Sequence, residues 1–165
     1  PLPGFAIGGL AVGESKPEMY QVLDWLTLIM PADKPRYLMG VGAPDDLVNA
    51  VLRGVDLFDC VLPTRLARHN SAFIKGGRLN LRNAKFARDP KPICEDCQCD
   101  TCQRFSRAYL RHLVKANEIL AHMLITTHNL HFLLTLMSNM RQAIRKGNLT
   151  QFASAFLAHY QSKNP

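Results

Sequence analysis

Residues 36–63, RYLMGVGAPDDLVNAVLRGVDLFDCVLP, contain two short apolar runs separated by a segment with helical character. The runs are RYLMGVG at 36–42 and VDLFDCVLP at 55–63, and both have the length and bounds of buried strands. Between them, Pro44 stands where a first helical turn tolerates proline, acidic residues follow it, and Arg53-Gly54 provides a stop signal. The stretch therefore predicts a strand, a helix and a second strand.

The same alternation extends toward the first residues of the chain. Residues 4–10, GFAIGGL, form another apolar run, and residues 17–29 carry apolar side chains at helical spacing. Strands that alternate with helices over short connections pair in parallel, which predicts an α/β sheet or barrel. Chemistry in such folds collects at the carboxyl ends of the strands, so Gly8-Gly9, Met39-Gly40 and Asp59 are expected to converge on one face. Three strands make either a very small α/β domain or part of a barrel.

The second half of the chain has a different pattern. Residues 72–81 predict a hairpin across the turn Lys75-Gly76-Gly77. From residue 103 onward the apolar spacing predicts three helices, at roughly 103–123, 129–146 and 149–161.

Positive charge is concentrated in one segment. The formal net charge is +7, and residues 65–91 contain eight basic residues but only one acidic residue, Asp89. Like charges on one surface repel each other, and a polyanion relieves that repulsion while its counterions are released. The segment therefore favours a nucleic-acid partner, although a solvated face remains an alternative. Its basic residues are Arg65, Arg68, Lys75, Arg78, Arg82, Lys85, Arg88 and Lys91.

A second basic group lies in the predicted helix 103–123. Arg104, Arg107, Arg111 and Lys115 recur at steps of three and four, which places them along one helix face. That face either grips a phosphate backbone or is simply solvated.

The hydropathy pattern predicts a cytoplasmic protein without a membrane segment. The chain has no run of about 18 uninterrupted apolar residues. Its first residues, PLPGFAIGGL, lack the basic leader and cleavage site of a signal peptide.

Four cysteines within nine residues favour a metal site. Cys94, Cys97, Cys99 and Cys102 are too close together to cross-link a fold of this size by disulfides. The pattern Cys97-x-Cys99-x2-Cys102 predicts structural zinc, with Cys94 or a histidine such as His128 as the fourth ligand. Iron–sulfur ligation and crowded free thiols are the alternatives.

Asp59 is the candidate catalytic acid. It follows Val55, Leu57 and Phe58 at the end of a strand that we expect to be buried, where a carboxylate is costly unless it is used. It could instead cap a helix or pair with Arg65. Beside a cationic segment, a carboxylate suits attack on the anomeric carbon of a ribose, with formation of a glycosyl ester.

The residues around the first two strand ends suit a flat ligand. Gly8-Gly9 does not belong to a phosphate-binding fingerprint, but a backbone without side chains can approach a purine edge closely. A tight turn without a ligand is equally compatible with the motif. Met39 could stack on a base, although such a methionine is more often part of a core.

Several longer strings carry a family resemblance across essentially the whole chain. They are GFAIGGLAVGE, PRYLMGVG, DLFDCVLPTR, LRNAKF, the CxCxxC cluster, SRAYLRHL and THNLHF. In this order and spacing the chain resembles the C-terminal half of bacterial tRNA-guanine transglycosylase. The resemblance implies a (β/α)8 TIM-type barrel with an inserted zinc-binding subdomain and C-terminal helices. It implies barrel units over 1–70, a basic hairpin and zinc subdomain over 71–128, and helices packed on the barrel over 129–165.

The resemblance also implies an activity. Such enzymes exchange guanine at the wobble position of the tRNA anticodon loop for 7-aminomethyl-7-deazaguanine, in queuosine biosynthesis. Asp59 matches the nucleophile that forms a covalent aspartyl–ribosyl intermediate. The resemblance further implies one structural zinc ion per chain and a homodimer.

Other site residues are carried over by position. Gly9, Leu10, Ala11 and Met39 match residues that bind the base. Cys97, Cys99, Cys102 and His128 match the zinc ligands, in place of Cys94. The positions that match RNA contacts are Gly40, Val41, Gly42, Ala43, Pro44, Asp45, Asp46, Thr64, Arg65, Leu66, Ala67 and Arg68.

The chain departs from the family pattern at three points. Many members carry lysine at the position of Ala43, and Cys94 is additional. The acid/base aspartate and the side chains that recognise the base edge belong to the half that this chain does not include, so we expect the chain alone to be inactive. The alternative function is a non-catalytic, zinc-stabilised RNA-binding module or accessory subunit.

Overall fold

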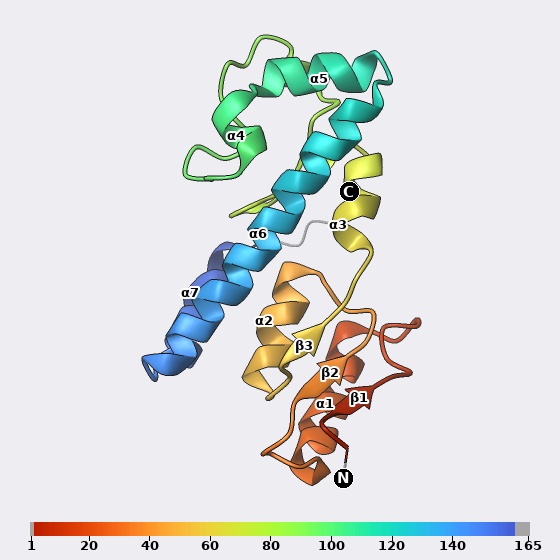
Figure 1. Cartoon of the computed structure of the whole chain (residues 1–165), viewed down its shortest axis with the longest axis vertical. Helices are drawn as coiled ribbons and strands as arrows, with labels where there is room; N and C mark the ends of the chain where they lie inside the picture. Colours follow the sequence, from red (N-terminus) through yellow and green to blue (C-terminus); the bar gives the residue numbers. More distant parts are fainter. Residues whose placement is uncertain (1, 161–165) are drawn as a thin grey trace. The chain divides into compact units, whose positions relative to one another are not determined.

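The computed structural model describes residues 2–160 and divides them into two compact units. The first unit runs to Val61 and includes Gln142–Leu157, and the second spans Leu62–Arg141 and resumes at Ala158. Figure 1 shows the elements in chain order: β1 (Phe5–Ile7), α1 (Lys16–Ile29), β2 (Arg36–Leu38), α2 (Pro44–Leu52), β3 (Leu57–Phe58), α3 (Leu62–Arg68), β4 (Ser71–Ile74), β5 (Gly77–Asn80), the 3-10 helix η1 (Ala84–Phe86), α4 (Asp100–Arg104), α5 (Arg107–Lys115), α6 (Ile119–Arg145) and α7 (Leu149–His159).

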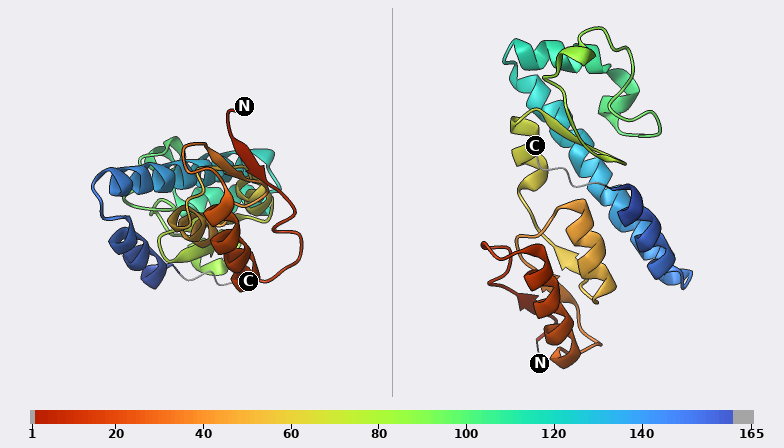
Figure 2. Two further views of the ribbon diagram at one scale, coloured as in Figure 1. Left: turned by 90° about the horizontal axis from the view of Figure 1, so that it is seen from below. Right: turned by 180° about the vertical axis from the view of Figure 1, so that it is seen from behind.

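The first unit contains a parallel three-stranded sheet, as its sequence predicts. The strand order is β1-β2-β3, and both neighbouring pairs are parallel. Figures 1 and 2 show the three strands side by side, with α1 and α2 as the connections between them. The alternation of strand and helix is therefore confirmed, and all three strands end at the same edge.

The two faces of this sheet differ in burial. Ile7 and Leu38 are paired across β1 and β2, and both are buried in a core with Met19 and Leu23 of α1. Side chains alternate between faces along a strand, so Ala6, Tyr37 and Leu57 share the opposite face. That face is open.

The expectation that the third strand is buried is wrong. Leu57 is 53% exposed, and Asp59 is also exposed. Among the described residues β3 pairs only with β2, so it is an edge strand whose second side reaches solvent. Apolar residues make a strand suitable for burial, but they do not show whether other residues of the same chain bury it.

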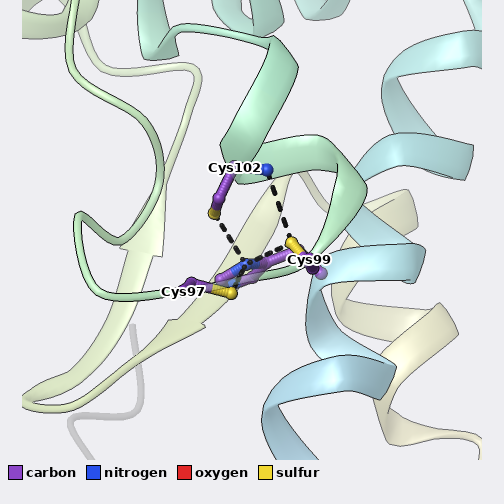
Figure 3. A group of neighbouring side chains, drawn as sticks. Cys97, Cys99 and Cys102 are labelled. Atoms are coloured by element: carbon purple, nitrogen blue, oxygen red, sulfur yellow. Dashed lines mark hydrogen bonds between the residues drawn. The ribbon is translucent and has the colours of Figure 1, made fainter.

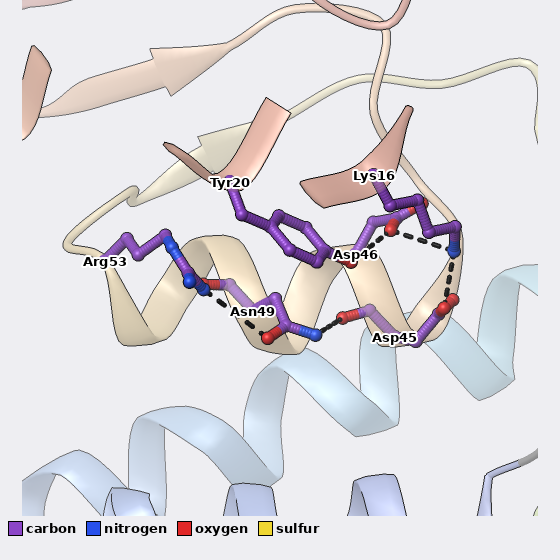
Figure 4. Close-up of polar contacts among 6 residues, drawn as sticks. All are labelled: Lys16, Tyr20, Asp45, Asp46, Asn49 and Arg53. Carbon is purple, nitrogen blue, oxygen red and sulfur yellow. Dashed lines mark hydrogen bonds and ion pairs between the residues drawn. The ribbon is translucent and has the colours of Figure 1, made fainter. Parts of the chain in front are cut away.

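Polar contacts join α1 to α2 (Figure 4). Lys16 forms ion pairs with Asp45 and Asp46, and the distance between Lys16 Nζ and Asp46 Oδ1 is 2.9 Å. The Tyr20 hydroxyl donates to Asp46 Oδ1 at 2.6 Å. The guanidinium carbon of Arg53 lies 4.8 Å from the centre of the Tyr20 ring, within the range of a cation–π contact. These contacts hold the two helices together on one side of the sheet.

The second unit is built on an antiparallel hairpin. Strands β4 and β5 pair from Ser71 with Asn80 to Ile74 with Gly77, which confirms the predicted hairpin. Its buried side chains join those of α5 and α6 in one hydrophobic core, to which α6 contributes Ala121 and Ile125. The Thr101 hydroxyl, fully buried, donates to the Leu124 carbonyl at 2.7 Å and ties α4 to α6.

The predicted helices 103–123 and 129–146 are wrong at their boundaries. The helical structure is interrupted at Ser106, whose hydroxyl accepts from the Tyr109 N–H at 3.1 Å and caps α5. It breaks again at Asn117, which has a positive φ of 56°. From Ile119 the helix then continues without glycine or proline to Arg145, so His128 lies within α6 and not at a helix start.

The predicted basic face of helix 103–123 is also wrong, because Arg104 belongs to α4 and the other three residues belong to α5. Arg107 is moreover engaged within the unit, with its Nη1 atom 3.0 Å from the Asp89 carboxylate. Arg111 Nε donates to the Asn83 carbonyl at 3.0 Å. Both side chains therefore take part in contacts within the unit.

Helix α6 has the length and apolar composition of a membrane-crossing helix. In its middle, however, His128 and Asn129 are fully buried and hydrogen-bonded to the hairpin. This is the environment of a central helix in a folded unit.

Candidate active site and metal centre

The ends of the three parallel strands lie together, as the sequence predicts. The Met39 N–H donates to the Ile7 carbonyl at 3.1 Å, and the Gly40 N–H donates to Asp59 Oδ1 at 3.1 Å. A Cβ atom placed on Gly8 would lie 3.7 Å from the Met39 sulfur. The glycine turn, the methionine and the carboxylate therefore form one site in the first unit.

Two donors hold the Asp59 carboxylate. The Tyr37 hydroxyl donates to Oδ1 at 2.6 Å, in addition to the Gly40 N–H. Tyr37 and Leu57 are partners across β2 and β3, so Tyr37 lies on the open face of the sheet. The hydrogen bond from Tyr37 and then that from Gly40 lower the pKa of Asp59, because both favour the charged form. Asp59 is thus an exposed and ionised carboxylate at a strand end.

The turn after β1 is held open by its own backbone and by Glu14. Gly9 and Ala11 both have positive φ, 75° and 59°, and the Ala11 conformation is uncommon for a residue with a side chain. The Glu14 carboxylate accepts from the N–H groups of Ala11 and Val12. The hydrogen bond from Ala11 is the main reason that the pKa of Glu14 is lowered. Leu10 lies between the two strained positions and is half-buried.

The loop after β2 leads directly into α2. Gly40 has a φ of 76° and is exposed, whereas Val41 and Gly42 are buried. A Cβ atom on Gly42 would lie 2.3 Å from Cβ of Cys60, so only glycine fits there. Ala43 is half-buried and precedes the buried Pro44 at the first turn of α2.

Asp45 and Asp46 are held by Lys16 and do not point freely into solvent. Their side chains are 14% and 13% exposed, respectively. Both carboxylates are therefore engaged within the unit.

The segment 64–68 forms most of α3, in the second unit. Leu66 and Ala67 are buried, Thr64 is half-buried, and Arg65 and Arg68 are exposed. The exposed arginines are thus the members of this segment that can reach a ligand with their side chains.

The basic segment keeps much of its charge free. Lys75 pairs with Asp96 and Lys91 with Glu95. In the described part of the chain no acidic side chain pairs with Arg65, Arg68, Arg82 or Arg88, all of which are exposed.

The cysteine cluster forms a four-ligand site in the second unit. The ligand atoms of Cys97, Cys99, Cys102 and His128 all lie within 4.8 Å of one another. The three sulfur atoms surround Nδ1 of His128 at 3.7, 3.6 and 3.3 Å, and Figure 3 shows the three cysteines close together. A buried set of three thiols and one imidazole fits one tetrahedral zinc ion.

The orientation of His128 supports this fit. Its Nε2 atom lies 2.7 Å from the Phe73 carbonyl, which can only accept, so Nε2 carries the proton. A neutral ring protonated at Nε2 has its lone pair on Nδ1, which faces the sulfur atoms. A hydrogen bond from the second nitrogen to a carbonyl is typical of metal-bound histidines.

The thiols differ in their tendency to ionise. Burial opposes ionisation of Cys99, but contacts with His128 and with the Cys102 N–H lower the pKa of this thiol to about 6. Burial raises the pKa of Cys97 and of Cys102. Cys94, the alternative fourth ligand, is outside the group of four, and burial raises its pKa as well. The group that could hold a metal ion therefore includes His128 and not Cys94.

Comparison with known proteins gives a consistent result. A family model described as queuine tRNA-ribosyltransferase matches residues 1–162. The chain belongs to this family. A queuine tRNA-ribosyltransferase from Pelotomaculum thermopropionicum is 57% identical over 159 residues, or 96% of this chain, and one from Bacillus subtilis is 55% identical over 163 residues, or 99%. The chain spans 43% of the length of each of these relatives.

Three further residues of the chain were not predicted as site residues. Tyr37 holds Asp59, Glu14 holds the glycine turn, and Asn129 is fully buried beside the metal ligand His128. The signal for Tyr37 was its spacing of two from Met39, which puts both on one face of a strand. Glu14 and Asn129 lie in the strings GFAIGGLAVGE and THNLHF, but their partners are not evident from the sequence.

Replacement of Tyr37 by phenylalanine is expected to raise the pKa of Asp59 toward its usual value. The hydroxyl stabilises the carboxylate, so its loss makes protonation easier, and protonation then begins at a higher pH. The expected result is an upward shift of the acidic limb of any activity that needs the Asp59 anion. An NMR titration of the Asp59 carboxyl carbon measures this directly. Tyr109→Phe, on an exposed tyrosine of the second unit, is the control and should leave the titration unchanged.

Proposed function

We propose that this chain is the C-terminal part of a tRNA-guanine transglycosylase. The enzyme would exchange guanine at the wobble position of tRNA for 7-aminomethyl-7-deazaguanine. The observation that carries the proposal is the Asp59 carboxylate, which is exposed, ionised and held by two donors beside the glycine turn in a chain of this family. The names of the relatives give the reaction class.

The proposed reaction has two displacements at C1′ of the ribose. An Asp59 oxygen attacks C1′, the bond from C1′ to guanine breaks, and guanine leaves with the bonding electrons and takes up a proton. The incoming base then attacks C1′ through a ring nitrogen and gives up the proton of that nitrogen, the ester to Asp59 breaks, and the carboxylate is regenerated. Two inversions give net retention, as in retaining glycoside hydrolysis. The acid/base group for the proton transfers would come from the part of the enzyme outside this chain.

The local hydrogen bonds suit this role. Attack requires the carboxylate form, and Tyr37 and Gly40 favour that form. These two donors bind Oδ1, and we assign the attack to the second oxygen, Oδ2. This arrangement fixes the direction of the carboxylate before RNA arrives.

We assign base binding to Gly9, Leu10, Ala11 and Met39. Gly9 and Ala11 have positive φ, and Glu14 stabilises the turn through the N–H groups of Ala11 and Val12. Met39 is 47% exposed beside Gly8, so its polarizable sulfur is accessible to a flat ring.

We assign RNA binding to the loop at 40–46 and to α3, with Arg65 and Arg68 as its charged contacts. The exposed arginines of the basic segment would add an electrostatic attraction that does not depend on sequence. Because Ala43 cannot replace a lysine contact, the loop would contribute less to affinity than in members that carry lysine there.

The same proposal covers the architecture. The open face of the sheet, with Ala6, Tyr37 and Leu57, would line the interior of a (β/α)8 barrel that is closed by strands outside this chain. Residues 1–70 would then be barrel units, 71–128 an inserted zinc subdomain, and 129–165 helices packed on the barrel. A homodimer in the cytoplasm, with tRNA as partner, is part of this proposal.

Zinc at the Cys97, Cys99, Cys102 and His128 site would cross-link the second unit and would take no part in the reaction. The ligands come from the loop before α4, from α4 itself and from α6. Two hydrogen bonds of the chain itself support the same arrangement. His128 attaches α6 to the hairpin, and Thr101 attaches α4 to α6.

Exchange of radiolabelled guanine into tRNA tests the proposal. We expect incorporation by the full-length protein and none by the 165-residue chain alone, because the acid/base group is not part of it. Incorporation by the chain alone would contradict the division of catalytic residues, and no incorporation by the full-length protein would favour the RNA-binding module.

A further inference from the structure

Asn129 uses its whole side-chain amide inside the second unit. It is fully buried in α6, and its Oδ1 atom accepts from the Phe73 N–H at 2.9 Å. Its Nδ2 atom donates to the Pro63 carbonyl at 3.0 Å and to the Ser71 carbonyl at 3.1 Å. One side chain thus joins α6 to β4 and to the first turn of α3. A buried amide with all these partners satisfied is expensive to replace.

The contacts to β4 satisfy backbone hydrogen-bonding groups on the outer edge of the hairpin. Backbone groups alternate in direction along an antiparallel pair, and those of Ser71 and Phe73 that bond to α6 lie on the side away from β5. The Phe73 carbonyl accepts from His128, the neighbour of Asn129 and a ligand of the metal site. The N–H and the carbonyl of Phe73 are therefore held by adjacent residues of one helix.

The contact to Pro63 has a different consequence. Helix α3 is only seven residues long, and so short a helix has little stability of its own. Its position depends on tertiary contacts, which include the burial of Leu66 and Ala67 and the hydrogen bond from Asn129. Arg65 and Arg68 project from this helix and are exposed.

We propose that Asn129 is a positioning residue for RNA binding. It fixes α3 through the Pro63 carbonyl, so that Arg65 and Arg68 meet the RNA backbone in a preset arrangement, and through Phe73 it links α3 to the metal ligand His128. This inference rests on the proposed function, since it takes α3 as an RNA contact. Preset side chains bind more tightly because less freedom is lost on binding.

The test compares Asn129→Ala, Asn129→Asp and Thr101→Val in the full-length protein. Asn129→Asp keeps the acceptor for the Phe73 N–H and lacks the donors to Pro63 and Ser71. Thr101→Val is the matched control, since it removes a buried hydrogen bond to α6 that does not involve α3. Zinc content and thermal unfolding are measured for each variant.

We expect both Asn129 variants to raise the KM for tRNA about 10-fold, as loss of buried hydrogen bonds predicts. The kcat and the KM for the free base should change less than about twofold, because the reacting groups are untouched. Hydrogen exchange of amides 64–68 should become about 10-fold faster, with one zinc ion retained per chain. Thr101→Val should change none of these RNA-dependent values.

Three outcomes would overturn the inference. An unchanged KM for tRNA and unchanged exchange in α3 would show that Asn129 does not act on this helix. An equal increase of KM in Thr101→Val would show a general loss of stability. Loss of zinc together with faster hydrogen exchange throughout α6 in both Asn129 variants would show that the residue stabilises the entire second unit. Failure of the proposed function is distinct, since the unmodified full-length protein would then not exchange guanine into tRNA.

Discussion

Asp59→Asn in the full-length protein is expected to abolish the covalent protein–RNA adduct and to lower base exchange by about 10⁴-fold or more. An amide has nearly the same shape as the carboxylate, and its oxygen can still accept from Tyr37 and Gly40. It is not a nucleophile, however, so no ester to the ribose can form. The measurement is a denaturing gel with labelled tRNA, together with the rate of guanine exchange.

The control for this experiment is Asp33→Asn. Asp33 is an exposed acid between α1 and β2. It is in the same unit as Asp59, but it precedes β2, whereas Asp59 follows the carboxyl end of β3. This variant should form the adduct at the normal rate. An adduct that survives denaturation in Asp59→Asn would show that another group attacks the ribose, and the assignment of the nucleophile would be wrong.

Removal of the metal is expected to unfold the second unit. Binding of structural zinc to small domains contributes on the order of 10 kcal/mol or more, which is comparable to the entire stability of a domain. The four ligands come from two parts of the chain, residues 97–102 and His128, and without the metal their buried thiols and imidazole lose their partner. A strong chelator, or His128→Ala, should therefore make hydrogen exchange of the backbone amides in β4 and α4 much faster.

Cys94→Ser provides a matched control for the metal experiment. Cys94 is half-buried near the cluster but is not one of its four ligands. The variant should retain one zinc ion per chain and normal protection of β4 and α4. A loss of zinc as large as in His128→Ala would mean that Cys94 takes part in ligation.

The main features of the first unit could be predicted from the sequence because they depend on local patterns. Apolar runs separated by a helical segment specify parallel strands, and the carboxyl ends of parallel strands must share an edge. Gly8, Met39 and Asp59 are therefore brought together by topology alone. Tyr37 was missed because a hydrogen bond to Asp59 depends on the register between β2 and β3, which the sequence does not display.

The second unit was predicted less completely. The apolar spacing continues across Ser106 and Asn117, so the breaks between α4, α5 and α6 were not visible in the periodicity. The cysteine spacing specified three metal ligands, but several histidines lie in helical patterns and only the resemblance to a family selected His128. Asn129 was overlooked because a buried asparagine in a helix has no sequence signature apart from its partners.

The outer side of α1 offers a spectroscopic advantage. Trp25 is the single tryptophan of the chain, and it is 62% exposed near Leu28 and Ile29, which are more exposed still. Intrinsic indole emission thus arises at one known place, without any introduced label. Contact of another polypeptide with this apolar side would move the emission to shorter wavelength, so such an association could be followed in real time.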